Sequence, residues 1–174
     1  EVLANLDRIL KVGAPHPSFK GVVLHLPRHA MLWFGDLKSG YNDYAVEAFE
    51  KETGIQVPVD RNDPMRGRLY AEWLLANARE PWIDWRCRKL SEFYRILAER
   101  TAAARPDLRL VINSMIPVPE IGAANYTAAD FVKVKNREAG LDPRYYAGIG
   151  NVILDQTVYP ADYRWRGGKP IRPE

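Results

Sequence analysis

The chain has 174 residues, a length typical of one domain that can bury a core of its own. Its net charge is +3, from 25 basic and 22 acidic residues, and 47% of its residues are hydrophobic, as in an ordinary globular protein. Basic and acidic residues are interleaved along the expected helices, as in "RCRKLSE", which indicates solvated helix faces and argues against a nucleic-acid partner. No apolar run approaches the roughly 20 residues that span a bilayer, so no membrane partner is expected.

The beginning of the chain and its single cysteine allow two further expectations. The sequence opens at Glu1 without a methionine and passes directly into helical spacing, which suggests a segment of a longer protein and leaves localisation open. Cys87 excludes an internal disulfide and falls on the apolar face of an expected helix, so we expect a core residue there. The oligomeric state is left open.

A helix followed by a short buried strand is predicted at the start of the chain. Residues 2–12 place their leucines and an isoleucine on one side of a helix, and "GAPHPS" ends it. The run "GVVLHL", residues 21–26, is apolar and β-branched throughout. Strands that are buried on both faces have such continuous runs, which favours parallel pairing under a cover of helices.

Three helices are predicted next. Residues 42–54 form the first, with Asn42 or Asp43 as the cap and Gly54 as the end. The second runs over 63–80, where Asp63 precedes a proline suited to a first turn. The third and strongest runs over 80–106, and its apolar face comprises Ile83, Cys87, Leu90, Tyr94 and Leu97.

The remaining pattern completes an alternation of helices and strands. A second strand is predicted at 108–113, a helix at 127–140 and a third strand at 150–158, whereas 163–174 lacks periodicity and is expected to be an irregular tail. This order predicts a single α/β domain over 1–174 with parallel β/α repeats. Three strands are too few to close a barrel, so the chain is expected to be an open sheet or, as we favour, part of a (β/α)8 TIM barrel.

Polar residues gather where each predicted strand ends. In parallel α/β folds, ligands bind at the carboxyl ends of the strands, so this gathering predicts a site. The expected ligand-binding residues are His25, Arg28, His29, Trp33, Asn113, Gln156 and Tyr159.

Most of these residues also have a structural interpretation. His25 can be a hydrogen-bonded residue at a strand edge, and Asp36 can stabilise a turn through its side chain. Asp155 is harder to explain in this way, because a carboxylate within an apolar strand must be paired or functional. Since "LPR" between His25 and His29 contains a proline, the two histidines do not share a helix face. A metal site is therefore not favoured, and no cofactor is expected.

Three quoted segments carry a family resemblance. The segment "GYNDYAVEAFEKETGI", the helix "WIDWRCRKLSEFYRILAE" and the strand "LRLVINSM" follow "GVVLHL" in this order. Over roughly residues 20–116 the chain resembles bacterial family-10-like glycosyl hydrolases and related barrel glycosidases. The resemblance implies a (β/α)8 barrel and hydrolysis of glycosidic bonds in a poly- or oligosaccharide.

Glycoside hydrolysis uses a pair of carboxyl groups that flank the scissile bond. The acids near the expected strand ends are Asp36, Asp155 and Glu120, which are the candidate catalytic residues. Two alternatives stay open: a non-catalytic carbohydrate-binding or scaffold module of the same fold, and a metal-dependent hydrolase that uses His25 and His29.

Overall fold

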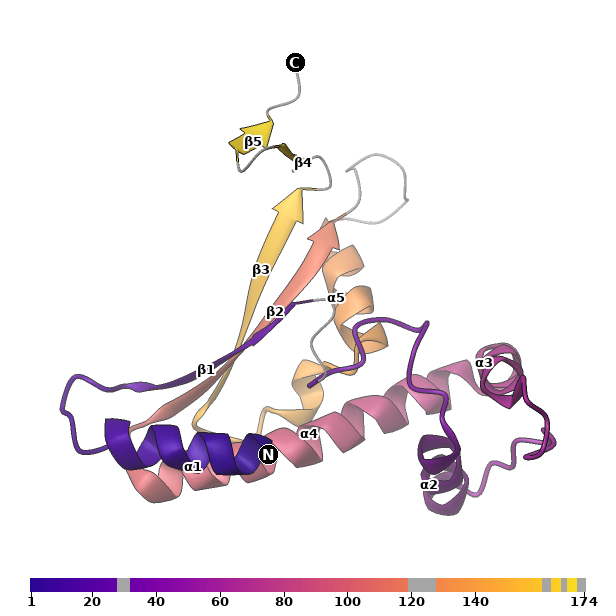
Figure 1. Cartoon of the computed structure of the whole chain (residues 1–174), viewed down its shortest axis with the longest axis horizontal. Helices are drawn as coiled ribbons and strands as arrows, with labels where there is room; N and C mark the ends of the chain where they lie inside the picture. The colour runs from indigo at the N-terminus through magenta and orange to yellow at the C-terminus, as the bar shows by residue number, and fades with distance from the viewer. Residues whose placement is uncertain (28–31, 119–127, 161–163, 167–168, 172–174) are drawn as a thin grey trace.

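The computed structural model describes residues 1–27, 32–118, 128–160, 164–166 and 169–171 (Figure 1). Over these residues the fold is α/β, with a three-stranded parallel sheet and five α-helices. The strands of the sheet are β1 (Gly21–Leu26), β2 (Arg109–Val118) and β3 (Val152–Pro160). The helices are α1 (Val2–Gly13), α2 (Asp43–Thr53), α3 (Arg66–Asn77), α4 (Arg79–Ala104) and α5 (Ala128–Glu138), and a 3-10 turn, η1 (Pro143–Tyr145), follows α5.

The three strands lie in the order β1-β2-β3 and run parallel, as predicted. The register pairs Val22 with Leu110 and Leu110 with Val152, and residues 110–114 of the central strand have a neighbour on both sides. Because all three strands run the same way, their carboxyl ends lie at the same edge of the sheet, as in all parallel α/β proteins.

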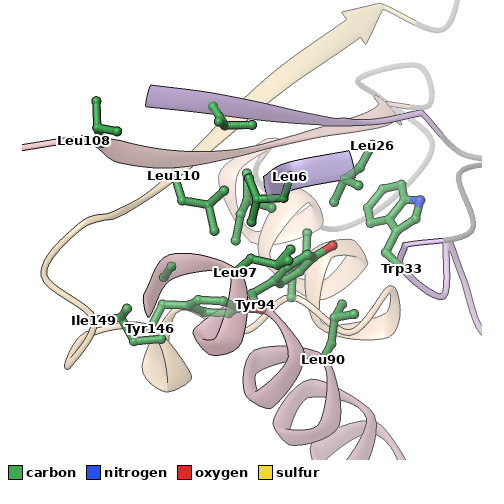
Figure 2. Packing of buried hydrophobic residues seen from close by; sticks show 14 of the residues in the cluster. Leu6, Leu26, Trp33, Leu90, Tyr94, Leu97, Leu108, Leu110, Tyr146 and Ile149 are labelled. Carbon is green, nitrogen blue, oxygen red and sulfur yellow. The ribbon is translucent and has the colours of Figure 1, made fainter. Parts of the chain in front are cut away.

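Helices cover one face of this sheet. Figure 1 shows α1 and α4 below the strands, with α5 beside β2. The side chains of Leu108, Leu110 and Ile112 point toward the helices and are at most 1% exposed. Figure 2 shows the core that they form with residues of α1 and α4, among them Leu6, Tyr94 and Leu97. The hydrophobic effect of this burial fixes the helices to the sheet.

A second hydrophobic core lies away from the sheet, where α2 and α3 pack on the first half of α4. It is mainly aromatic: the Trp82 ring stacks on Tyr41 and on Trp85, at centroid distances of 5.5 and 5.1 Å. The Phe49 ring meets Trp82 edge to face at 5.2 Å. Helix α4 therefore belongs to both cores, and the "YND" and "W..WR" segments of the sequence join at the second one.

Local signals set the helix ends in two different ways. Asn42 caps α2 by accepting a hydrogen bond from the Ala45 amide, and Gly54 ends it with a φ of +76°, as the sequence predicts. In contrast, α3 begins at Arg66 and not at Asp63. The Asp63 carboxylate accepts from the Met65 amide at 2.7 Å, which makes a turn ahead of the helix.

The end of the chain differs from the predicted irregular tail. Two short strands, β4 (Arg164–Arg166) and β5 (Lys169–Ile171), pair antiparallel there. Two glycines separate them in the sequence, and a two-residue Gly-Gly link is a hairpin signal. Each strand has only three residues, which is too short to show the alternation that predicts a strand.

Candidate functional site

Three polar side chains form a row across the sheet. The row lies near the carboxyl end of β1 but within β2 and β3, which each continue for five more residues, to Val118 and Pro160. The register pairs His25 of β1 with Asn113 of β2, and Asn113 with Asp155 of β3. His25 Nδ1 lies 2.8 Å from Asn113 Oδ1, and Asn113 Nδ2 donates to Asp155 Oδ2 at 2.6 Å. We call these three residues the polar row. They were predicted from three separate stretches of sequence, and the structure brings them into direct contact.

The polar row lies on the face of the sheet opposite the helices. Successive side chains of a strand alternate between faces, so the buried Ile112 and the neighbouring Asn113 point to opposite sides. His25 and Asp155 are exposed, whereas Asn113 between them is only 7% exposed. The side chains of His25 and Asp155 are thus accessible to a ligand, and the Asn113 amide between them contacts both.

An apolar row lies next to the polar row on the same face. It consists of Val23, Val111 and Ile153, which are paired across the three strands. Val23 is 61% exposed and Ile153 is 47% exposed, although the continuous apolar strands predict burial on both faces. We call the face that holds both rows the open face of the sheet.

The loop after β1 is fixed to α4 and to the end of α5. The Tyr94 hydroxyl donates to the Leu32 carbonyl at 2.6 Å, and the Phe34 amide donates to the Ala139 carbonyl at 3.1 Å. Trp33 was expected to contact substrate, but its ring is 7% exposed within the sheet–helix core, and its indole donates to the Pro27 carbonyl. A ring buried to this extent offers a sugar little surface.

Asp36 occupies a turn of this loop. Its Oδ1 accepts a hydrogen bond from the Lys38 amide at 2.7 Å, and its carbonyl accepts from Arg86 Nη2 at 2.7 Å. These contacts match the structural interpretation of Asp36, in which the side chain stabilises a turn. Neither of these two contacts involves the polar row, and the catalytic role of Asp36 stays a prediction.

Gln156 points to the opposite face from its neighbour Asp155. Its Oε1 accepts from Asn136 of α5 at 2.9 Å, and the Ser114 hydroxyl donates to the same Asn136 side chain at 3.2 Å. Gln156, predicted to bind substrate together with His25 and Asn113, therefore lies on the opposite face of the sheet from them. The cause is strand alternation, since two consecutive residues of β3 cannot both face the open side.

Several predicted residues lie outside the part of the chain that the structure describes. These are Arg28, His29 and Glu120, and the side chain of Tyr159, whose backbone is in β3. Among the described residues, no group of three or more His, Cys, Asp or Glu side chains is placed to hold a metal ion. The His25 and His29 metal pair is not tested.

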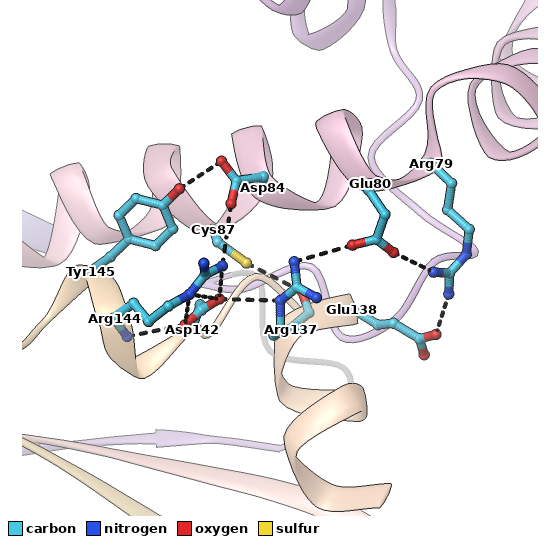
Figure 3. Close-up of polar contacts among 9 residues, drawn as sticks. All are labelled: Arg79, Glu80, Asp84, Cys87, Arg137, Glu138, Asp142, Arg144 and Tyr145. Atoms are coloured by element: carbon cyan, nitrogen blue, oxygen red, sulfur yellow. Dashed lines mark hydrogen bonds and ion pairs between the residues drawn. The ribbon is translucent and has the colours of Figure 1, made fainter. Parts of the chain in front are cut away.

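A second polar cluster joins α4 to the segment that follows α5. Figure 3 shows its members, which are Arg79, Glu80, Asp84, Cys87, Arg137, Glu138, Asp142, Arg144 and Tyr145. Asp142 lies at its centre, 3% exposed, and accepts from Arg137 Nε at 3.1 Å and from Arg144 Nη2 at 2.7 Å. Burial opposes ionisation of Asp142, but hydrogen bonds from Arg144 outweigh it and lower the pKa of this carboxyl.

Every acid that Figure 3 draws is bonded to a partner within the cluster. Burial raises the pKa of the Cys87 thiol to about 12, so it stays protonated, and it donates to the Arg137 carbonyl at 3.4 Å. The cysteine is a core residue, as predicted. We therefore assign this cluster a structural role and the polar row the functional one.

Comparisons with known proteins were made at three levels. No family model, curated protein or solved structure matches this chain. None of the helices in the described part of the chain is long and apolar enough to cross a membrane. The function must therefore be argued from the polar row itself.

The sequence did not single out the residues that support the row. Val23, Val111 and Ile153 resemble any buried strand residue, and only their shared register shows that they adjoin the polar row. The alternation within "VVLH" and "VILD" would have placed each polar residue on the same face as the valine or isoleucine two positions before it.

Proposed function

We propose that this chain is part of a (β/α)8-barrel glycoside hydrolase and that the polar row contacts a poly- or oligosaccharide. The observation that carries the proposal is the contact of His25, Asn113 and Asp155 on the open face of three parallel strands. In barrel enzymes, catalytic residues come from the carboxyl ends of several strands, and His25 has such a position in β1, whereas β2 and β3 extend beyond the polar row.

The one-sided cover of the sheet supports a barrel. Parallel sheets are normally covered on both faces, whereas helices of the described residues cover one face of this sheet. In a barrel the helices lie outside, and the inner face is filled by branched side chains of the strands. Val23, Val111 and Ile153 have the residue types of such an inner face, and the polar row lies beside them toward the carboxyl end of β1.

The chemistry of the polar row suits a saccharide. Sugar rings combine hydroxyl groups, which donate and accept hydrogen bonds, with apolar C–H faces. His25 and Asp155 provide exposed polar groups for the hydroxyls, and Val23 and Ile153 provide exposed apolar surface beside them. Asp155 is the carboxylate of the row, and we assign it the role of acid, base or nucleophile.

The experiment compares wild-type protein with Asp155→Asn in the release of reducing ends from xylan, cellulose and starch. Removing a catalytic carboxylate is expected to lower the rate by at least about 100-fold. Glu99→Gln, which changes an exposed carboxylate on α4, is the control and should keep the wild-type rate. Full activity of Asp155→Asn would refute the catalytic assignment.

One observation favours a non-catalytic carbohydrate-binding module as the second candidate. Hydrolysis needs two carboxyl groups, whereas the polar row contains one, and Asp36 is engaged in a turn. A binding module would retain xylan, cellulose or starch in affinity electrophoresis and release no reducing ends, with or without the Asp155→Asn substitution. Binding of none of these polysaccharides would count against both candidates.

A further inference from the structure

The polar row combines three side chains with different hydrogen-bonding capacities. An ionised carboxylate only accepts hydrogen bonds, an amide both donates and accepts, and an imidazole presents one donor and one acceptor when neutral. The contacts within the row are 2.8 Å from His25 to Asn113 and 2.6 Å from Asn113 to Asp155. These capacities restrict how the protons can be arranged.

The arrangement follows from the Asp155 end of the row. A carboxylate oxygen accepts hydrogen bonds, so the atom that lies 2.6 Å from Asp155 Oδ2 is a donor. That atom is Asn113 Nδ2, which leaves Asn113 Oδ1, an acceptor, facing the imidazole. His25 Nδ1 must then carry the proton. The reverse amide orientation would bring an amide oxygen against a carboxylate oxygen.

We infer that Asn113 is a positioning residue: it holds His25 in the Nδ1–H tautomer, so that Nε2 is presented as a hydrogen-bond acceptor for a ligand hydroxyl. Its use for a saccharide rests on the proposed function. Among the described residues His25 makes its hydrogen bond through Nδ1 and not through Nε2, and the side chain is exposed, so a ligand can reach Nε2. The near-complete burial of Asn113 keeps the amide from rotating freely.

The same geometry has an electrostatic consequence. The chain of donors runs from His25 through the amide to Asp155, so the negative carboxylate polarises both hydrogen bonds in the same direction. Polarisation of this kind increases the electron density on the imidazole and strengthens Nε2 as an acceptor. The amide itself transfers no proton, so it orients the two outer groups and does not act as a catalytic residue.

The ¹⁵N chemical shifts of the imidazole nitrogens test this inference directly. At about pH 8.5, where imidazole side chains are neutral, the wild-type protein should show a protonated Nδ1 and an unprotonated Nε2 for His25. Asn113→Leu has a similar volume and no polar group, and it should return His25 to the Nε2–H form that free imidazole favours. The double variant Asn113→Asp with Asp155→Asn keeps an acceptor for Nδ1–H and a donor–acceptor pair between positions 113 and 155, and it should restore the wild-type pattern at the histidine.

Asn136 provides a matched control. It makes the corresponding amide bridge on the helix-covered face, between Ser114 and Gln156. Asn136→Leu should therefore lower stability without changing the tautomer of His25. If Asn113→Leu and Asn136→Leu both lower stability but only Asn113→Leu changes the His25 tautomer, the change of tautomer is not a result of lost stability.

The outcomes separate this inference from the proposed function. A wild-type His25 in the Nε2–H form, or an Asn113→Leu variant that keeps Nδ1–H, would overturn the inference whatever the protein binds. The expected tautomers together with hydrolysis at least about tenfold slower in Asn113→Leu would support both. The expected tautomers in a protein that neither binds nor cleaves xylan, cellulose or starch would support the positioning role and refute the saccharide.

Discussion

Arg86 of α4 is a buried cation, and its replacement gives a sharp test of the packing described above. The residue is 0% exposed, and its Nη2 donates to the Asp36 carbonyl at 2.7 Å. Its guanidinium lies 4.2 Å from the centroid of the Phe34 ring. Its Nε and Nη1 are buried and have no hydrogen-bond acceptor among the described residues. A buried charge with incomplete partners is destabilising in the folded state.

The free-energy cost of burying the Arg86 charge can be worked out from the same surroundings. Burial lowers the pKa of Arg86 to about 10, and the difference from the usual value of about 12.5 corresponds to about 3 kcal/mol at 1.36 kcal/mol per pKa unit. Against this stand the hydrogen bond to the Asp36 carbonyl, about 1.5 to 3 kcal/mol, and the contact with Phe34, about 0.5 to 2 kcal/mol. The free energy gained from these two contacts is therefore nearly equal to the free energy lost by burying the charge.

Arg86→Met should therefore unfold with a free energy within about 2 kcal/mol of wild type, because methionine fills most of the volume without a charge. Arg86→Ala leaves a cavity as well and should be at least about 2 kcal/mol less stable than Arg86→Met. Urea denaturation followed by tryptophan fluorescence measures both. Arg88→Met is the control: Arg88 lies on the same helix and pairs with Glu52 of α2 at the surface, and its loss should cost less than about 1 kcal/mol.

The reasoning would be refuted if Arg86→Met were as unstable as Arg86→Ala. Equal loss would mean that the charge itself stabilises the fold, and hence that the guanidinium has partners stronger than one carbonyl and one ring.

Two further predictions concern stability. Gly21 has a φ of +148°, and a Cβ there would lie 2.0 Å from the Arg109 carbonyl oxygen. Gly21→Ala should therefore lower the free energy of unfolding, measured by urea denaturation, by at least about 2 kcal/mol. The control is Gly148→Ala at an exposed position where a Cβ would meet nothing within 4 Å, and this variant should change stability little. Equal effects would refute the close approach of β1 and β2. The lowered pKa of Asp142 means that its contribution is present at neutral pH and lost as the pH falls below about 4, through the folded-state pKa. Asp142→Asn should lose about 1.5 to 3 kcal/mol at pH 7, and its stability should fall less steeply than that of wild type in acid; parallel pH profiles would contradict this assignment.

Local patterns were sufficient for most helices and strands. The apolar spacing of Ile83, Cys87 and Leu90 predicted α4, and the side chains that it placed together are buried in the structure. The start of α3 was missed because Asp63 followed by a proline suits both a helix cap and a preceding turn. Only the contacts of the following residues decide between the two.

The candidate site was predicted in part, because the position of a residue along the chain relative to an apolar run is readable from sequence, whereas the length of the strand and the direction of each side chain are not. His25, Asn113 and Asp155 were expected near one another and are in contact. Trp33 was expected beside them and is buried in the sheet–helix core, since the loop after β1 folds back onto α4. Loop paths depend on such long-range contacts and leave no periodic signal.

The sequence by itself determined the five helices, apart from some of their ends, and the parallel pairing of the three sheet strands, because hydrophobic periodicity and strand burial depend on neighbouring residues. Only the tertiary structure decided which residues share a face. Register pairs His25 with Asn113 and Asn113 with Asp155, and strand alternation sends Gln156 to the helices. Register is set by packing between strands that lie 42 to 88 residues apart, so no local stretch of the chain contains it.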